Sequence, residues 1–119
     1  TPMANAYDKD IFDKMKKIAD ENDIDVREGV HIQFLGPSYE TRAEVELARM
    51  LGADTVSMST VFDCIICNYL KMKVAGIASV VNVFTSKEKE EKLNHQEVLD
   101  NAKKSCIKIK TIIENLIKE

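Results

Sequence analysis

Helical and strand-type patterns alternate along this chain, and this alternation constrains the fold more than any other feature of the sequence. The helical patterns, in which apolar residues recur every three or four positions, cover residues 11–18, 41–51, 61–70 and 98–116. Three short runs rich in β-branched residues lie between them, at residues 30–35, 54–60 and 74–81. Because short links between strands and helices favour parallel strands, the order predicts an α/β fold with a mostly parallel sheet and flanking helices.

The junction between the first strand and the next helix carries the most specific local signals. Gly36-Pro37 ends the apolar run, since glycine permits unusual backbone angles and proline has no N–H for a ladder. Thr41 and Glu44 have the spacing of a capping box, which predicts that a helix begins there. The ring of Tyr39 and the carboxylate of Glu40 are held between two regular elements. A loop of this kind serves either as a plain connection or as a site.

Similar signals place the later helices. Gly52 is expected to end the helix that begins at Thr41, because glycine readily adopts a left-handed C′ conformation. Thr60 can cap the helix of residues 61–70, whose apolar character predicts that it is buried. Asn94 can cap the last helix. The mixed charges of residues 85–92 favour a solvated loop or a frayed helix.

Composition limits the class of protein. A chain of 119 residues with 45% hydrophobic content suits one domain, 1–119, with a single core. The net charge of −3 argues against nucleic acid as a partner. No apolar run reaches the roughly 18 residues of a membrane span, and the first residues lack the pattern of a signal peptide. A cytoplasmic protein without membrane contact is expected, and its opening residues read like the middle of a longer chain.

The three cysteines do not have the pattern of a disulfide framework or of a metal site. Their number is odd and their spacing is not repeated, so free thiols are expected. Cys64 and Cys67 form a CxxC pair inside a helical apolar pattern, with no second pair or histidine at ligand spacing. We interpret them as small hydrophobic residues and expect no metal.

Ligands of open α/β sheets bind beyond the carboxyl ends of the strands, and the residues at those positions are chemically suggestive. They are Tyr39 and Glu40 after the first strand, Met58, Ser59 and Thr60 after the second, Asn82 after the third, and His95 at the last helix start. An aromatic ring can stack on a planar base, while a carboxylate and an amide can bind a purine edge. A hydroxyl near a helix N-terminus can hold an anion. The set suits a polar heterocycle attached to a sugar.

Each of these residues also has a purely structural interpretation. Asn82 is also a common turn residue, Ser59 or Thr60 can be a helix cap, and Met58 can be core filler. His95 in the first turn of a helix can simply be solvated. The residues alone leave both interpretations open.

Three ordered motifs resemble the trimeric purine nucleoside phosphorylases. They are Gly36-Pro37-Ser38-Tyr39-Glu40-Thr41, the run from Gly52 to Val61 (GADTVSMSTV), and Asn94-His95-Gln96-Glu97-Val98-Leu99. The opening Asn5-Ala6-Tyr7-Asp8 is also similar. The resemblance implies the nucleoside phosphorylase fold and a C-terminal part of that domain. It implies a pentosyltransferase that reversibly cleaves the N-glycosidic bond of purine ribo- and deoxyribonucleosides with inorganic phosphate as co-substrate and no other cofactor.

The resemblance also implies roles for individual residues. Tyr39 would lie against the base, Glu40 would bind the ring N–H edge, and Asn82 would hydrogen-bond N7 and O6 of the leaving purine. Met58 would pack under the sugar, Ser59 would touch phosphate, and His95 would reach the 5′-hydroxyl. Val56 would be a further substrate contact. Glu40, Asn82 and His95 would be the catalytic set.

Two differences from the family pattern are visible, and one part of it is absent. Ser57 stands where the family often has glycine, and Val81 precedes Asn82 where many members have threonine. The Gly-rich phosphate loop of the family does not occur in this chain, so Ser59 is its one expected phosphate ligand. The alternatives are a catalytically incompetent purine-binding or interaction fragment and a methylthioadenosine phosphorylase-like enzyme, although Asn82 favours 6-oxopurines over the latter.

Overall fold

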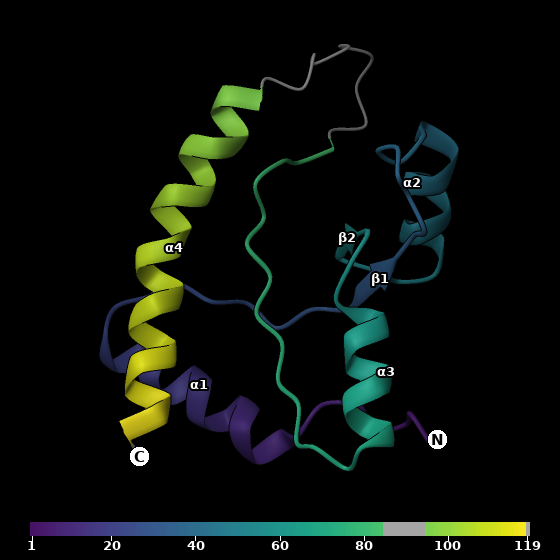
Figure 1. Cartoon of the computed structure of the whole chain (residues 1–119). Coiled ribbons are helices and arrows are strands. Elements are labelled where there is room, and N and C mark those ends of the chain that lie inside the picture. The colour runs from purple at the N-terminus through teal and green to yellow at the C-terminus, as the bar shows by residue number, and fades with distance from the viewer. Residues whose placement is uncertain (85–94, 119) are drawn as a thin grey trace.

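The alternation of helices and strands is present in the structure, a computed structural model that describes residues 1–84 and 95–118 (Figure 1). The elements are α1 (Lys9–Glu21), β1 (His31–Gln33), α2 (Arg42–Met50), β2 (Thr55–Ser57), α3 (Val61–Tyr69) and α4 (His95–Lys118). Figure 1 shows α1 beside the C-terminal half of α4, while α2, α3 and both strands form a second group. The α/β class with a parallel sheet and flanking helices is therefore confirmed.

The small core of the first group lies between α1 and α4. Asp8 caps α1, because its carboxylate accepts the N–H of Ile11 at 3.0 Å. The apolar face of α1 then packs on α4, as its amphipathic pattern predicts. The buried cluster consists of Ile18, Ala19, Ile24 and Ile112, with Met15 and Leu116 packed against it.

The two strands form a parallel ladder that fixes the geometry of the site. The register pairs His31 with Thr55 and Gln33 with Ser57. The ladder continues by one bond from Phe34 N–H to the Ser57 carbonyl, at 2.9 Å. Both strands are shorter than the predicted runs. Their carboxyl ends nevertheless lie side by side, which is where the sequence places its candidate residues.

The predicted third strand, residues 74–81, is not a strand in the structure. The segment is extended and runs between the two groups of elements (Figure 1). Within the described part of the chain, this segment makes one backbone–backbone hydrogen bond, which Asp8 N–H donates to the Val74 carbonyl at 2.7 Å. The β-branched pattern was correct for an extended backbone, but a strand also needs a neighbour that pairs with it residue by residue.

Two expectations about α3 are wrong. Of its side chains only Cys64 is buried, whereas Phe62, Ile66 and Tyr69 are exposed. The described elements pack on one side of this helix and leave its other apolar residues uncovered. Thr60 makes no side-chain cap, because its φ of 92° turns the residue away from the usual cap conformation.

The last helix agrees with its pattern, although part of the expectation lies outside the described residues. α4 covers the predicted residues 98–116 and extends them at both ends. The predicted cap Asn94 and the charged run 85–92 fall outside what the structure describes. Gly52, with φ of 80°, closes α2 as predicted.

The molecule exposes far more surface than a compact domain of its length. Its accessible surface is 9622 Å², against about 6,500 Å² from the size scaling of folded monomers. The radius of gyration is 15.7 Å, against about 13.5 Å for a compact chain. Many large apolar side chains of α2, α3 and residues 72–84 are exposed. Within the part of the chain that the structure describes, no helix is long and apolar enough to cross a membrane.

Candidate active site

The connection from β1 to α2 forms the centre of the candidate site. Gly36 adopts a φ of 66°, a left-handed conformation that glycine accepts readily, and the Gly36-Pro37 peptide bond is cis. The connection ends in the predicted capping box: Glu44 N–H donates to Thr41 Oγ1 at 3.3 Å, and Thr41 N–H donates to the Glu44 carboxylate at 2.7 Å. Both ends of the loop are thereby fixed, which holds the side chains between them in place.

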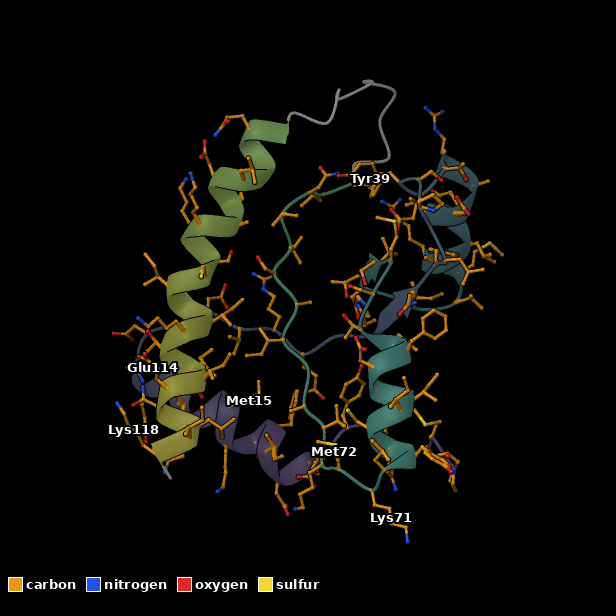
Figure 2. The ribbon with its side chains drawn as sticks, viewed as in Figure 1. Met15, Tyr39, Lys71, Met72, Glu114 and Lys118 are labelled. Carbon is orange, nitrogen blue, oxygen red and sulfur yellow. The ribbon has the colours of Figure 1, made fainter. Side chains whose placement is uncertain are left out.

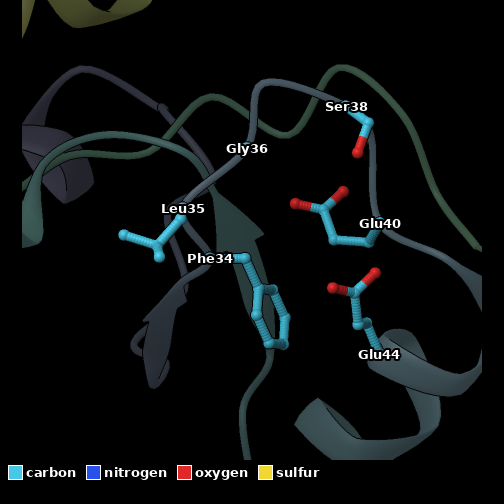
Figure 3. Close-up of a pocket in the computed structure, with 6 residues that line it drawn as sticks. All are labelled: Phe34, Leu35, Gly36, Ser38, Glu40 and Glu44. Carbon is cyan, nitrogen blue, oxygen red and sulfur yellow. The ribbon is translucent and has the colours of Figure 1, made fainter.

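A hollow of about 210 Å³ lies beside this connection (Figure 3). Its lining residues are Phe34, Leu35, Gly36, Ser38, Glu40 and Glu44. Figure 3 shows the carboxylates of Glu40 and Glu44 near one another, with the Phe34 ring on one side and the Ser38 hydroxyl on the other. An aromatic face beside acceptor-only groups suits a flat ligand that presents N–H donors.

The two carboxylates differ in their surroundings. The backbone N–H of Thr41, followed by its hydroxyl, lowers the pKa of the Glu44 carboxyl below its ordinary value. The Thr41 hydroxyl donates to that carboxylate at 2.8 Å, so one of its oxygens takes two hydrogen bonds. Glu40 has no such cap, and its carboxylate is the one that remains available to a ligand in the hollow.

The end of β2 packs directly against this turn. A Cβ added to Gly36 would lie 2.5 Å from Met58 Sδ and 2.9 Å from its Cγ, so Met58 fills the space left by the missing side chain. After it, the Ser59 N–H donates to Ser57 Oγ at 3.2 Å, and the Ser57 hydroxyl donates to the Ser59 carbonyl at 2.7 Å. Ser59 thus stands in a tight turn just before α3.

Hydrogen bonds on both sides of Asn82 attach its segment to two helices. Asn101 on α4 donates to the Val81 carbonyl at 3.5 Å. The Arg49 guanidinium on α2 donates to the Phe84 carbonyl at 2.8 Å. Asn82 itself is exposed. Its position is therefore held from both sides although the segment is not part of the sheet.

The structure places most of the predicted site residues at the carboxyl ends of the two strands, and it separates others from them. Glu40 lines the hollow, and Met58 lies against the same turn. Tyr39 does not line the hollow and is 57% exposed (Figure 2). Val56 lies half-buried in the middle of β2, and His95 begins α4 with a side chain outside the description.

Of the residues that line the hollow, the sequence indicates only Glu40 as a site residue. Its pattern places Phe34 and Leu35 in the strand, Gly36 and Ser38 in the connection, and Glu44 in the capping box. The signal for Glu44 was available: a residue at the third position of a helix faces back toward the loop that it caps. Phe34 could have been found from the two-residue period of the strand, which aims alternate side chains to opposite faces.

Thiols and metal ligands do not form a second site in the described residues. The thiols of Cys64, Cys67 and Cys106 are free, as the sequence indicated. No group of three or more histidine, cysteine, aspartate or glutamate residues that could hold a metal ion occurs within residues 1–84 and 95–118.

The fold and this strand-end site define the chain as a member of the phosphorylase superfamily, whose family model matches residues 1–118. The chain is 40% identical over 102 residues to purine nucleoside phosphorylase 1 of Bacillus subtilis, covering 86% of this chain and 37% of the relative. The mouse purine nucleoside phosphorylase is 35% identical over 120 residues, covering 97% and 41%. The resemblance inferred from the sequence motifs is therefore confirmed. This chain spans about two fifths of the length of these relatives.

Solved structures agree with these relatives. A Schistosoma purine nucleoside phosphorylase in complex with hypoxanthine superposes with a TM-score of 0.90 at 30% identity, covering 99% of this chain and 43% of that one. The Schistosoma mansoni enzyme in complex with inosine gives 0.92 at the same identity and coverage. A methylthioadenosine phosphorylase from Schistosoma mansoni gives 0.88 at 22% identity, which indicates a shared fold and no more.

Proposed function

We propose that the protein carrying this chain is a purine nucleoside phosphorylase and that this chain supplies its base-binding part. The observation that carries the proposal is the Glu40 carboxylate, which stands in a hollow of about 210 Å³ beside an aromatic ring. The solved relatives in complex with hypoxanthine and inosine support a 6-oxopurine as the ligand of such a hollow.

The chemistry follows from the charge that develops during the reaction. The bond between C1′ of the sugar and N9 of the base breaks, and a phosphate oxygen forms a new bond to C1′. The purine leaves with the electron pair, so groups that stabilise a negative base accelerate its departure. Asn82 would hydrogen-bond N7 and O6 of the base as this charge grows. Glu40 would accept a hydrogen bond from the ring N–H and so orient the base.

The remaining residues would position the substrates. Tyr39 would lie against the base and Met58 under the sugar, with Val56 as a further contact. Ser59, in the turn before α3, would contact phosphate, because helix N-terminal amides favour an anion. His95 would reach the 5′-hydroxyl. The whole enzyme would be a cytoplasmic trimer that uses phosphate as co-substrate.

Phosphorolysis of inosine tests the proposal directly. Purified full-length protein is mixed with inosine and phosphate, and hypoxanthine release is followed. We expect phosphate-dependent release that falls at least about tenfold in Glu40→Gln, since the substituted amide no longer offers a charged acceptor to the ring N–H. Glu114→Gln is the matched control, because Glu114 lies on α4, does not line the hollow and pairs with Lys110 on the surface. Release without phosphate, or equal loss in both variants, would contradict the proposal.

A second candidate is a purine-binding module without catalysis, because the Glu40 carboxylate beside the Phe34 ring would be enough for binding a base. Calorimetry with hypoxanthine separates the two functions. Binding without phosphorolysis supports the module, whereas phosphorolysis supports the enzyme. Absence of binding would contradict both site assignments.

A further inference from the structure

Two side chains of β1 reach across to the connection between β2 and α3, residues 57–61. His31 Nε2 lies 2.9 Å from Ser57 Oγ. The Val61 N–H donates to Gln33 Oε1 at 2.8 Å. His31 and Gln33 are two residues apart on a strand, so their side chains leave the ladder on the same face. Side chains of β1 therefore bond to both ends of the connection between β2 and α3.

The hydrogen bonds of Ser57 fix the direction of its contact with His31. The Ser57 hydroxyl donates its single hydrogen to the Ser59 carbonyl, and its oxygen accepts the Ser59 N–H. The remaining lone pair can only accept, so His31 must donate from Nε2. In the neutral ring Nδ1 then accepts from the Thr55 hydroxyl, at 2.8 Å. The imidazole therefore contacts two residues of β2, Thr55 and Ser57, and only its bond to Ser57 reaches the Ser57–Ser59 turn.

Gln33 takes the place of the missing helix cap. Thr60 makes no side-chain cap, and the first N–H of α3 is satisfied instead by the Gln33 amide oxygen. This bond also fixes the orientation of the amide, since only the oxygen can accept. The Gln33 amide nitrogen is then buried and has no partner among the described residues. A buried unpaired donor opposes folding. If Gln33 served packing alone, an apolar side chain at this position would give a more stable protein.

We propose that His31 and Gln33 are positioning residues that hold residues 57–61 and thereby set where Met58 and Ser59 lie relative to the substrate. This inference rests on the proposed function, because it assumes that Ser59 faces phosphate. Met58 is already held against Gly36 on its other side. The contacts from β1 fix the backbone that follows it, at the point where the anion would meet the N-terminus of α3.

The test compares the KM for phosphate with the KM for inosine in full-length protein. Ser57→Ala removes the hydroxyl that locks the turn, and Gln33→Met removes the cap at nearly constant side-chain length. Gln33→Met is expected to raise the KM for phosphate about three- to tenfold, the effect of losing one hydrogen bond. Ser57→Ala removes all the hydrogen bonds of the Ser57 hydroxyl and should raise it at least as much. The KM for inosine should rise less than the KM for phosphate, because the base contacts lie in the other connection and Met58 is also held by its packing against Gly36.

Thr55→Val is the matched control. It removes the hydrogen bond at His31 Nδ1 at nearly constant shape and leaves the Ser57 contact in place. We expect its KM for phosphate to equal that of the unmodified protein. Thermal unfolding is measured for all variants. Gln33→Met also removes the unpaired donor, so its Tm should change little while its KM rises, a combination that a purely structural role does not produce.

The possible results separate this inference from the function on which it rests. If the unmodified protein shows no phosphorolysis, both the proposed function and this inference are overturned. Active protein whose Ser57→Ala and Gln33→Met variants keep the KM for phosphate would overturn the inference alone, as would an equal rise in Thr55→Val. If Gln33→Met does not fold, Ser57→Ala decides the inference alone, and an unchanged KM for phosphate in that variant would overturn it.

Discussion

The sulfur of Met58 occupies the space that a side chain at position 36 would need, 2.5 Å from where the Cβ would stand. The two residues follow different strands, and the parallel ladder brings them together because it aligns the carboxyl ends of β1 and β2. The turn that carries Glu40 and the residue expected under the sugar therefore form one packing unit. A substitution that moves the turn should therefore also move Met58.

Gly36→Ala tests this contact, and Gly52→Ala is its matched control. Both glycines have a left-handed φ, 66° and 80°, so each alanine is expected to cost about 1–2 kcal/mol in backbone strain. Only Gly36 has a neighbour in the way, since a Cβ at Gly52 meets nothing within 4 Å. We expect both variants to lower the free energy of unfolding in urea, and only Gly36→Ala to raise the KM for inosine. A similar KM in both would show that Met58 moves aside without consequence.

Asn82→Asp is expected to shift the substrate preference from 6-oxopurines toward 6-aminopurines. A carboxyl group can accept from the N6 amino group and, when protonated, donate to N7, whereas it repels the O6 oxygen when ionised. The measurement is the ratio of kcat/KM for inosine to that for adenosine. A ratio is used because general damage to the enzyme cancels in it. An unchanged ratio would remove Asn82 from the base-binding set.

The sequence predicted the elements around the site well because their signals are local. Gly36, Thr41 and Glu44 act through their own backbone angles and hydrogen bonds, which do not depend on distant parts of the chain. The same reason accounts for Gly52, which ends α2 as expected. Glu40 could be placed at the strand end because both flanking elements were correct.

The errors concern features that depend on neighbours distant in sequence. Residues 74–81 have the composition of a central strand, but pairing requires a partner strand that periodicity cannot supply. The apolar residues of α3 predicted burial, yet what covers a helix is decided by tertiary packing. Thr60 is not a cap because its φ of 92° is not the cap conformation, and the first N–H of α3 is bonded instead by Gln33, far away in the sequence.

Acid should destabilise the chain partly through Glu44. Its folded-state pKa lies below the usual value of 4.5, because the carboxylate accepts the N–H and hydroxyl of Thr41. A lowered pKa contributes stability above the unfolded value, and this contribution is lost as the pH falls through the folded value. Between about pH 5 and pH 3, the Tm of the unmodified chain should therefore fall more steeply than that of Glu44→Gln. Glu46→Gln, which removes a carboxylate from the same helix without touching the cap, should keep the steep slope.

The packing of α1 on α4 should depend on single buried side chains, because the core of this group is small. Ile112 is 2% exposed and belongs to the cluster with Ile18 and Ala19, whereas Ile117 on the same helix is 78% exposed. Truncation to alanine should cost about 2–5 kcal/mol at Ile112, from lost burial and the cavity that remains. At Ile117 the cost should be about 0.5 kcal/mol or less. Urea unfolding followed by far-UV circular dichroism measures both. Equal costs would mean that α4 does not pack on α1 through the face that carries Ile112.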